Sequence, residues 1–530
     1  MRSPFPRVLA VAALLALAVV AAPSGAAARD VPADFQWGTA IAGFQTEMGR
    51  GRDLDRRTDW WAWTHDATNI ARGTVTDDRP EDGPGFLARY RQDVDLAARD
   101  LHLDAFRLGL EWSRIFPRST AGARTLAELD RLADHRALAR YRAILERIRA
   151  RGMTPWVTLS HFTLPSWAHD PIAMRTALAT VGPNDPPPDT GAPRGWLDRS
   201  TIAEFRKYAR YVAWKLGDVV DEWITLNEPM VVVTNGYVNI PGVVSGNFPP
   251  GAFNCRAAIT AIQNLADANA AAYDAVKAAD RRSATVRGFT GEAKAARARV
   301  GIVHNMVAFT PANAASALDR RGVRHANYLF NRLMLDAVIR GHRDRNADGV
   351  VTGDERDARR ANKADFVGLN YYFRGRITGL PTALTPLIPI LDFAPSTQYR
   401  SVSFPAAPPC PTTCTDFGWE IYPQGFRHVL GIAGGYGRKV IVTENGLADA
   451  DDDQRPGYLR SHLRAMHAAI RAREADVRGY FHWSLVDNFE WAVGYAQHFG
   501  LYRFDPVTLR RTARPSAAFY AQIARTDRIP

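Results

Sequence analysis

The feature that most constrains the fold is a series of eight short apolar segments that recur along the whole chain. They cover residues 35–38, 105–110, 155–159, 223–226, 300–303, 366–369, 440–443 and 480–484. Segments of four to six mostly apolar residues, rich in β-branched and aromatic types, are typical of strands buried on both faces of a sheet. We therefore predict eight strands.

Helical patterns separate these segments. Leu138, Tyr141, Leu145 and Ile148 recur at helical spacing, and Gly152 closes that element. Further amphipathic stretches cover residues 257–279, 328–340, 423–432 and 459–473. A helix over residues 201–216 is predicted to begin with a capping box formed by residues 201 and 204, a Thr-x-x-Glu pattern.

Eight strands alternating with helices predict an α/β fold, a single (β/α)8 TIM barrel with parallel strands. The alternative is a doubly wound open sheet, which usually carries a glycine-rich phosphate turn after its first strand. No such turn follows residues 35–38. About 500 residues after the N-terminal segment fit a barrel with insertions.

Two segments interrupt the pattern, residues 180–194, which are proline-rich, and residues 374–417. We predict that both are irregular. Each follows a strand, so in a barrel both lie at the C-terminal face, where active sites are built. They are expected to shape the entrance of a site.

The first residues have the composition of a secretory signal peptide. Arg2 and Arg7 precede the apolar residues 8–22, and small residues follow at 26–28. The apolar run is shorter than the roughly 20 residues that a spanning helix needs. We therefore predict a signal peptide over 1–28, a secreted protein without a membrane span, and one domain over 29–530.

The formal net charge is +12, and loss of Arg2 and Arg7 lowers it to about +10. The arginines are scattered along helical faces, which favours a solvated basic surface over a nucleic-acid site. No nucleic-acid partner is predicted, and adhesion to acidic cell-wall material stays an alternative. The oligomeric state cannot be inferred from these patterns.

A secreted chain with three cysteines leaves one unpaired. Cys410 and Cys414 lie within a proline-rich loop, where a local disulfide would hold a turn. Cys255 would then be free. A bridge from Cys255 to either of the others is the alternative.

Polar and aromatic residues stand where the predicted strands end. They are Gln45, Arg107, His161, Asn227, Glu228, Asn370, Tyr372, Glu444, Trp483, Glu490 and Trp491. Because parallel barrel strands end at one face, these side chains should converge there. Glu444 alone would be read as a structural acid at a strand end, but this convergence favours a site.

Glu228 and Glu444 end the fourth and seventh strands. Two carboxyl groups in different environments, one protonated and one ionised, are what retaining glycoside hydrolysis requires. We predict a separation of about 5–5.5 Å between them, whereas roughly 9 Å would indicate inversion. Metal-dependent hydrolysis is the rival, but His161 has no closely spaced histidine partner.

The chain also resembles glycoside hydrolase family 1, the β-glucosidases and their relatives, from residue 35 to about 505. The motifs that carry this resemblance are FQWGTA at 35–40, EWSRIFP at 111–117, TLNEP at 225–229, DFVGLNYY at 365–372, TENG at 443–446 and GYFHWSLVDNFEW at 479–491. All six occur in the order of the family.

The resemblance implies a role for each site residue. Glu228 would be the acid/base and Glu444 the nucleophile, with Arg107 and Tyr372 holding the nucleophile ionised. Asn227 would bond the sugar 2-hydroxyl, and Asn370 would lie beside the site. The remaining hydroxyls would contact Gln45, His161, Glu490 and Trp491, with Trp483 as the floor and Trp419 on the aglycone side.

The resemblance implies a β-glucosidase-like enzyme that acts on β-glycosides and needs no cofactor for catalysis. Glu490 argues against phosphorylated sugars, because a carboxylate repels a 6-phosphate. Phe162 stands where the family usually has tryptophan, and Gly109 replaces a common serine or asparagine. A transglycosidase using the same residues and a non-catalytic carbohydrate-binding protein are the alternatives.

Residues 344–355 match the twelve-residue EF-hand calcium loop at every ligand position. The ligands would be Asp344, Asn346, Asp348, Val350 through its carbonyl, Thr352 and Glu355, with Gly349 at the turn. EF-hands usually pair, and no second loop is present in the sequence. We predict a structural calcium ion here; a chance match in an acidic surface loop is the alternative.

Overall fold

The structure is a computed structural model of the chain that describes Met1 and residues 29–239, 247–280, 298–396 and 399–530. The predicted signal peptide, residues 1–28, lies outside the described residues except for Met1. Within the described residues, no helix is long and apolar enough to span a membrane.

Eight parallel strands close into a barrel in the order β1-β11-β10-β7-β5-β4-β3-β2. Their bounds are β1 Gln36–Ala40, β2 Ala105–Gly109, β3 Thr154–Ser160, β4 Glu222–Asn227, β5 Arg299–Asn305, β7 Phe366–Tyr371, β10 Lys439–Asn445 and β11 Val477–Trp483. Each predicted segment overlaps one of these strands. The predicted (β/α)8 TIM barrel is therefore confirmed.

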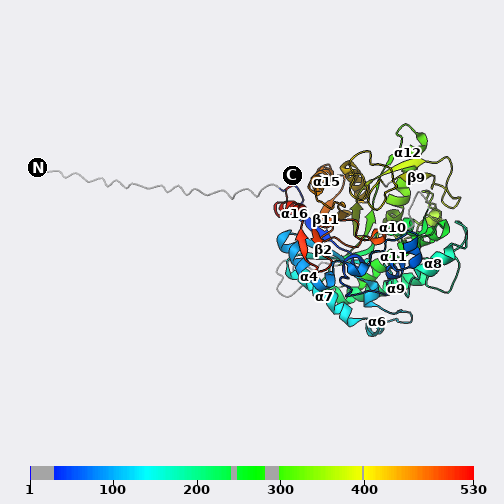
Figure 1. Cartoon of the computed structure of the whole chain (residues 1–530), viewed down its shortest axis with the longest axis horizontal. Helices are drawn as coiled ribbons and strands as arrows, with labels where there is room; N and C mark the ends of the chain where they lie inside the picture. The colour runs from blue at the N-terminus through cyan, green and yellow to red at the C-terminus, as the bar shows by residue number, and fades with distance from the viewer. Residues whose placement is uncertain (2–28, 240–246, 281–297, 397–398) are drawn as a thin grey trace.

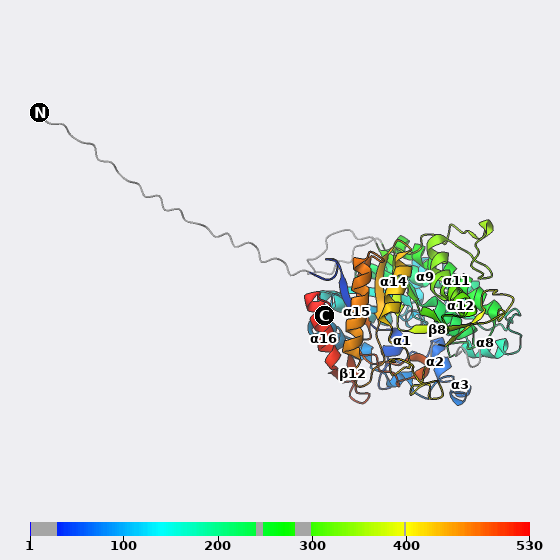
Figure 2. The same ribbon diagram turned by 90° about the horizontal axis from the view of Figure 1, so that it is seen from above.

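Helices surround the barrel (Figure 1). The longer ones are α4 Phe86–Asp95, α6 Leu126–Leu132, α7 His135–Ala150, α8 Pro171–Leu178, α9 Arg199–Leu216, α10 Pro229–Tyr237, α11 Cys255–Ala279, α12 Ala317–Ala326, α14 Pro423–Gly434, α15 Arg455–Arg471 and α16 Pro515–Thr526. Three of them, α14, α15 and α16, lie next to one another along one side (Figure 2). The predicted helix over 328–340 is helical but contains two π-helical segments, η4 Asn327–Arg332 and η5 Asp336–Arg340, which flank the short α-helix α13 Leu333–Leu335.

The strands β12 Tyr502–Phe504 and β13 Arg511–Ala513 form a separate two-stranded sheet, and the remaining helices are short. These helices are α1 Gly43–Thr46, α2 Asp59–Thr64, α3 Ala67–Ala71 and α5 Trp112–Ile115, with the turns η1 Pro80–Asp82, η2 Leu96–Asp100, η3 Gly195–Leu197, η6 Gly353–Glu355 and η7 Trp491–Val493. Helix α1 follows β1 directly and carries Gln45. It therefore places that side chain at the barrel end where the strands terminate.

The predicted capping box of α9 is wrong. The helix begins two residues earlier, at Arg199, and the Thr201 hydroxyl donates to the Gly195 carbonyl at 2.7 Å. The Glu204 carboxylate instead accepts from the Thr120 hydroxyl and pairs with Lys207 at 2.6 Å. Distant partners thus replaced the local hydrogen bonds that the pattern suggested.

The predicted irregular loop over residues 374–417 is partly wrong, because two strands form in it. β8 (Arg374–Gly379) and β9 (Phe393–Ser396) join β6 (Ala308–Pro311) in a separate three-stranded sheet. β8 pairs parallel with β6 and antiparallel with β9, so a distant segment supplies half of the pairing. The local sequence pattern of residues 374–417 does not indicate that β6 is the pairing partner.

The Cys410–Cys414 disulfide is present, and Cys255 is buried and free, as predicted. Within the described structure, no residue of the segment 180–194 lines the cavity in which the predicted site residues meet. Instead, Gly182 and Asp185 offer their carbonyls to the Asn254 amide at the start of α11, each at 3.1 Å. The expectation that this segment shapes the entrance was wrong, because it packs against an outer helix.

Candidate active site

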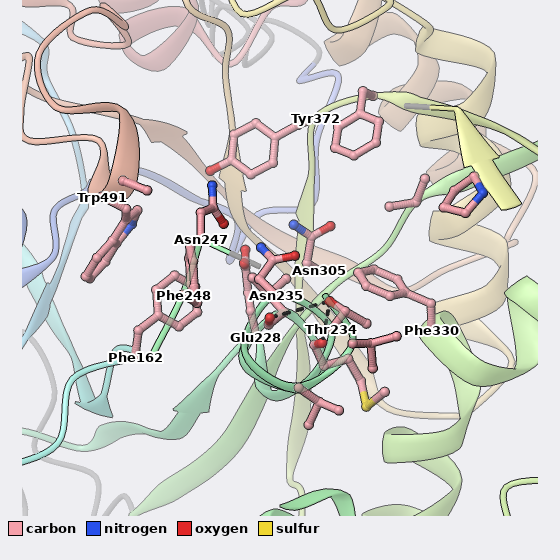
Figure 3. A pocket seen from close by; sticks show the side chains of 18 of the residues that line it. Phe162, Glu228, Thr234, Asn235, Asn247, Phe248, Asn305, Phe330, Tyr372 and Trp491 are labelled. Atoms are coloured by element: carbon pink, nitrogen blue, oxygen red, sulfur yellow. Dashed lines mark hydrogen bonds between the residues drawn. The ribbon is translucent and has the colours of Figure 1, made fainter. Parts of the chain in front are cut away.

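The predicted site residues meet around one cavity of about 580 Å³. Ten of the twelve predicted catalytic and sugar-binding residues line it: Gln45, His161, Asn227, Glu228, Tyr372, Trp419, Glu444, Trp483, Glu490 and Trp491. Arg107 and Asn370 are fully buried and hydrogen-bond to residues of the lining. Figure 3 shows Glu228 between Trp491 on one side and Phe330 on the other. The strand ends therefore converge as the sequence predicted.

A β-bulge delivers Glu444 into the cavity. The pairing of β10 with β7 shifts register after Val442, and Glu444 then lies opposite Asn370. Bulges re-aim side chains in this way and are frequent beside active sites. At Gly446, a Cβ atom would lie 2.0 Å from the Trp483 carbonyl oxygen, so the close approach of the two strand ends requires glycine.

Both carboxylate oxygens of Glu444 accept hydrogen bonds. Arg107 donates to Oε1 and the Tyr372 hydroxyl donates to Oε2. Arg107 is fully buried and also donates to Asn227 Oδ1 at 2.6 Å and to Thr158 at 3.2 Å. Burial, then the Glu444 charge, raises the Tyr372 pKa well above its usual value, so its hydroxyl stays a donor. The arrangement favours a carboxylate anion at Glu444.

Glu228 has a different environment. Its Oε1 accepts from the Asn370 amide at 2.5 Å, and Asn305 gives a second hydrogen bond. Burial, followed by the charge of Glu444, raises the Glu228 pKa to about 8. Glu228 also has a left-handed backbone, with φ +48°, which is uncommon for a residue with a side chain and costs about 1–3 kcal/mol. The two carboxyl groups therefore lie in different electrostatic environments within one cavity.

Several buried polar atoms of the lining have no hydrogen-bond partner within the described part of the chain. They include Gln45 Oε1, His161 Nδ1 and Asn305 Oδ1. Buried polar groups are nearly always paired, so unpaired ones at a cavity wall suit a ligand rich in hydroxyl groups. Gln45 donates through Nε2 to Glu490 at 3.2 Å, to Asn488 and to the Phe489 carbonyl, which leaves its oxygen for a ligand.

His161 is a neutral group at the polar end of the cavity. Burial, and then the positive charge of Arg107, lowers its pKa well below the usual value. Its Nε2 accepts from the Asn227 amide at 3.1 Å, which leaves the proton on Nδ1. The imidazole stacks near Trp491 and Trp483, with centroids 6.0 and 6.1 Å away. His161 can therefore donate to a hydroxyl beside two aromatic rings.

Both departures from the family pattern lie at this end. Phe162 packs edge-on against Trp491 with a centroid distance of 4.9 Å and offers no donor there. At Gly109, a Cβ atom would lie 3.3 Å from the backbone nitrogen of Gly43, in the segment that carries Gln45. The glycine thus lets β2 approach α1 closely.

Two site residues were missed by the sequence reasoning. Asn305 ends β5, the one strand for which no terminal residue was assigned, and the same strand-end rule would have found it. Glu111 lies in a recognised motif but was given no role. It is buried and bonds the backbone nitrogen of Phe44 and the Thr163 hydroxyl, which neighbour Gln45 and His161. Only the fold brings those segments together.

The predicted calcium loop forms a turn at Gly349, where φ is +82°. Asp344 is buried and accepts from the backbone nitrogens of Asp348 and Gly349 at 3.2 and 2.8 Å. Glu355 accepts from those of Arg345 and Thr352 at 3.0 and 3.1 Å. Among the described residues, Asp449, Asp451 and Asp453 alone form a group of three ligand atoms within 4.8 Å. The carboxylates of the loop therefore do not converge in this structure.

Comparison with known proteins agrees with this geometry. The sequence profile of glycosyl hydrolase family 1 matches residues 27–173 and 184–529. A β-galactosidase of Pyrococcus woesei is 38% identical over 91% of this chain and 94% of its own, and β-glucosidase A of Thermotoga maritima is 29% identical over 94% and 98%. The crystal structure of a Thermosphaera aggregans β-glycosidase superposes with a TM-score of 0.78 at 33% identity, over 94% of this chain and 97% of that one. The chain therefore belongs to glycosyl hydrolase family 1, a family of retaining β-glycosidases.

Proposed function

We propose that this enzyme releases the nonreducing terminal sugar of β-glycosides, glucosides among them, through a covalent glycosyl-enzyme intermediate. The observation that carries the proposal is the contrast between two buried carboxyl groups in one cavity. Glu444 accepts from the Arg107 cation, while burial and the Glu444 charge raise the Glu228 pKa to about 8. One fold thereby supports an anionic nucleophile and a neutral acid at the same pH.

In the proposed first step, Glu444 bonds to the anomeric carbon while the bond from that carbon to the glycosidic oxygen breaks. Glu228 transfers its proton to the departing oxygen. In the second step, Glu228 takes a proton from water, and the water oxygen displaces Glu444 from the anomeric carbon. Two displacements on the same carbon give net retention.

The polar end of the cavity supports binding of one sugar. Its unpaired atoms on Gln45 and His161 suit hydroxyl groups, and Asn227, between Arg107 and His161, suits the 2-hydroxyl. Burial, then the charges of Glu444 and Glu228, raises the Glu490 pKa to about 8. In its neutral form Glu490 can both donate to and accept from sugar hydroxyl groups, and it offers a phosphate no positive charge.

The carboxyl roles predict a pH dependence that one substitution removes. Glu228 must be protonated to act as the acid, so kcat/KM should fall about tenfold per pH unit above about 8 for an alkyl β-glucoside. Glu228→Gln should lose roughly 10²- to 10⁴-fold with that substrate and should no longer show the alkaline fall. Glu444→Gln should lose activity on every substrate.

Two other carboxyl groups with a pKa near 8, those of Glu490 and Glu111, provide matched controls. Glu490→Gln and Glu111→Gln should keep the alkaline fall, because neither residue donates the proton. Initial-rate assays across pH, with NMR detection of the first anomer released, check the proposal. Full activity of Glu444→Gln, or an inverted first product, would contradict it.

A buried network holds the sugar-binding segments in place. Glu111 accepts from the Phe44 backbone nitrogen at 2.9 Å and from the Thr163 hydroxyl at 2.7 Å. A Cβ atom at Gly43 would lie 2.4 Å from its Oε1, so the segment carrying Gln45 rests directly on this carboxyl group. We propose Glu111 as a positioning residue. Burial, then the charges of Glu47 and Asp55, raises its pKa to about 8.

Because the neutral form of Glu111 is favoured below that pH, glutamine should replace it well. Its carbonyl can accept from Phe44, and its amide can donate to Thr163. Glu111→Ala leaves both buried groups unpaired, at about 1–3 kcal/mol each, and should raise KM by roughly 10- to 100-fold. KM near the wild-type value in both variants would refute the positioning role.

We also propose that the enzyme is exported. The support is the basic and apolar composition of the first 28 residues, together with a disulfide of the kind that oxidising compartments favour. N-terminal sequencing of protein recovered from culture medium should begin near Arg29. Intact protein that starts at Met1 and stays inside the cell would contradict export.

We propose, finally, that residues 344–355 bind calcium. The support is a full set of EF-hand ligand types and a left-handed glycine at the sixth position, Gly349. Added calcium after chelation should raise the Tm, because binding to the folded state stabilises it. Glu355→Gln, which keeps an oxygen for the turn but loses the bidentate charge, should abolish the rise. An unchanged wild-type Tm would rule the site out.

A further inference from the structure

The cavity continues beyond Glu228, away from the sugar-binding residues. Figure 3 shows Phe330 on the opposite side of Glu228 from Trp491, Phe162 and Phe248. We call this continuation the apolar branch and define it by six lining residues: Ile262, Phe309, Leu329, Phe330, Leu391 and Phe393. They come from α11, β6, η4, β9 and the loop before β9. The three-stranded rim sheet therefore builds one wall of the branch.

The branch offers carbon surface and few polar groups. The whole described lining contains three acidic residues, Glu228, Glu444 and Glu490, and all three belong to the sugar end. The Thr234 hydroxyl already donates to the Met230 carbonyl at 2.9 Å, and the Asn239 amide to the Gly251 carbonyl at 3.2 Å. Asn235 and Asn305 lie next to Glu228, where the glycosidic oxygen would be (Figure 3). The six residues that define the apolar branch have only hydrocarbon side chains.

Several of these apolar side chains are not fully covered by protein. Phe309, Leu329, Phe330 and Leu391 are only half-buried, although each lines the cavity. Cavities lined mainly by apolar side chains favour an apolar ligand group. A second sugar placed against these six side chains would bury hydroxyl groups on hydrocarbon, which is unfavourable, whereas an alkyl chain there would be removed from water.

We infer that the preferred leaving group of this enzyme is a long-chain alkyl alcohol, so that its natural substrates are lipid-like β-glycosides. The sugar lies among Gln45, His161 and Trp491, the glycosidic oxygen lies at Glu228, and the chain lies along the apolar branch. A cavity of about 580 Å³ falls within the range of about 300–1,000 Å³ that holds drug-sized ligands. This inference rests on the proposed glycosidase activity and names its substrate class.

A series of alkyl β-glucosides from methyl to octyl, assayed below their micelle concentrations, tests the inference. Each buried methylene should raise kcat/KM about two- to fourfold until the branch is filled. Octyl β-glucoside should also exceed cellobiose, whose second sugar needs polar partners. A flat series, or a preference for cellobiose, would overturn the inference.

A matched pair of leucines tests the location. Leu391 lines the branch, whereas Leu384 is 39% exposed outside it, and its backbone nitrogen donates to the Leu391 carbonyl at 2.8 Å. Leu391→Asp should lower the ratio of octyl to methyl β-glucoside hydrolysis at least tenfold, with methyl hydrolysis nearly unchanged. Leu384→Asp should alter neither. Equal ratios in the two variants would place the chain elsewhere and overturn the assignment.

A second variant guards against misfolding. Phe330→Ala enlarges the branch and should shift the preferred chain length upward, and a shift in the other direction would count against the inference. The same assays separate the proposed activity from the proposed leaving group. If methyl and aryl β-glucosides are not hydrolysed at all, the proposed function fails. If they are hydrolysed with no dependence on chain length, only the alkyl leaving group is refuted.

Discussion

The site depends on one buried cation. The Arg107 side chain of β2 donates hydrogen bonds to Glu444 of β10, Asn227 of β4 and Thr158 of β3. A guanidinium with no exposure to solvent needs an anion and several acceptors nearby, since an unpaired buried charge is strongly destabilising. The same contacts orient Glu444 and, through Asn227, His161. Folding and preorganisation of the site therefore rest on the same hydrogen bonds.

The two carboxyl groups of the site, Glu228 and Glu444, have different hydrogen-bond partners. Glu444 accepts hydrogen bonds from Arg107 and Tyr372. Glu228 accepts hydrogen bonds from neutral amide groups, and the charge of Glu444 raises its pKa. Burial raises the pKa of Glu228, whereas Glu444 accepts a hydrogen bond from Arg107, so the placement of one arginine distinguishes the two groups. A bulge in β10 and a left-handed residue at the end of β4 point the two side chains into one cavity.

The cavity is chemically uneven along its length. At one end, unpaired polar atoms of Gln45 and His161 lie beside the tryptophans that can cover a sugar ring. At the other, phenylalanines and leucines from the rim sheet and the helices next to it line the wall. The barrel supplies the reaction and the inserted strands β8 and β9 supply that second environment, as expected when loop insertions carry specificity.

Local sequence patterns determined the eight strands, most of the outer helices and the residues at the strand ends. Each depends on residue types within a few positions, such as the apolar run before Glu444 or the glycine after it. The barrel topology then made those ends converge, which is why Glu228 and Glu444 could be paired 216 positions apart.

The start of α9, the rim sheet and the role of Glu111 were decided only by tertiary contacts. Glu204 accepts a hydrogen bond from Thr120, and β8 pairs with β6. Glu111 accepts hydrogen bonds from Phe44 and Thr163. Those partners lie far apart along the chain, and the energy of a buried hydrogen bond exists only once folding has removed the water between them.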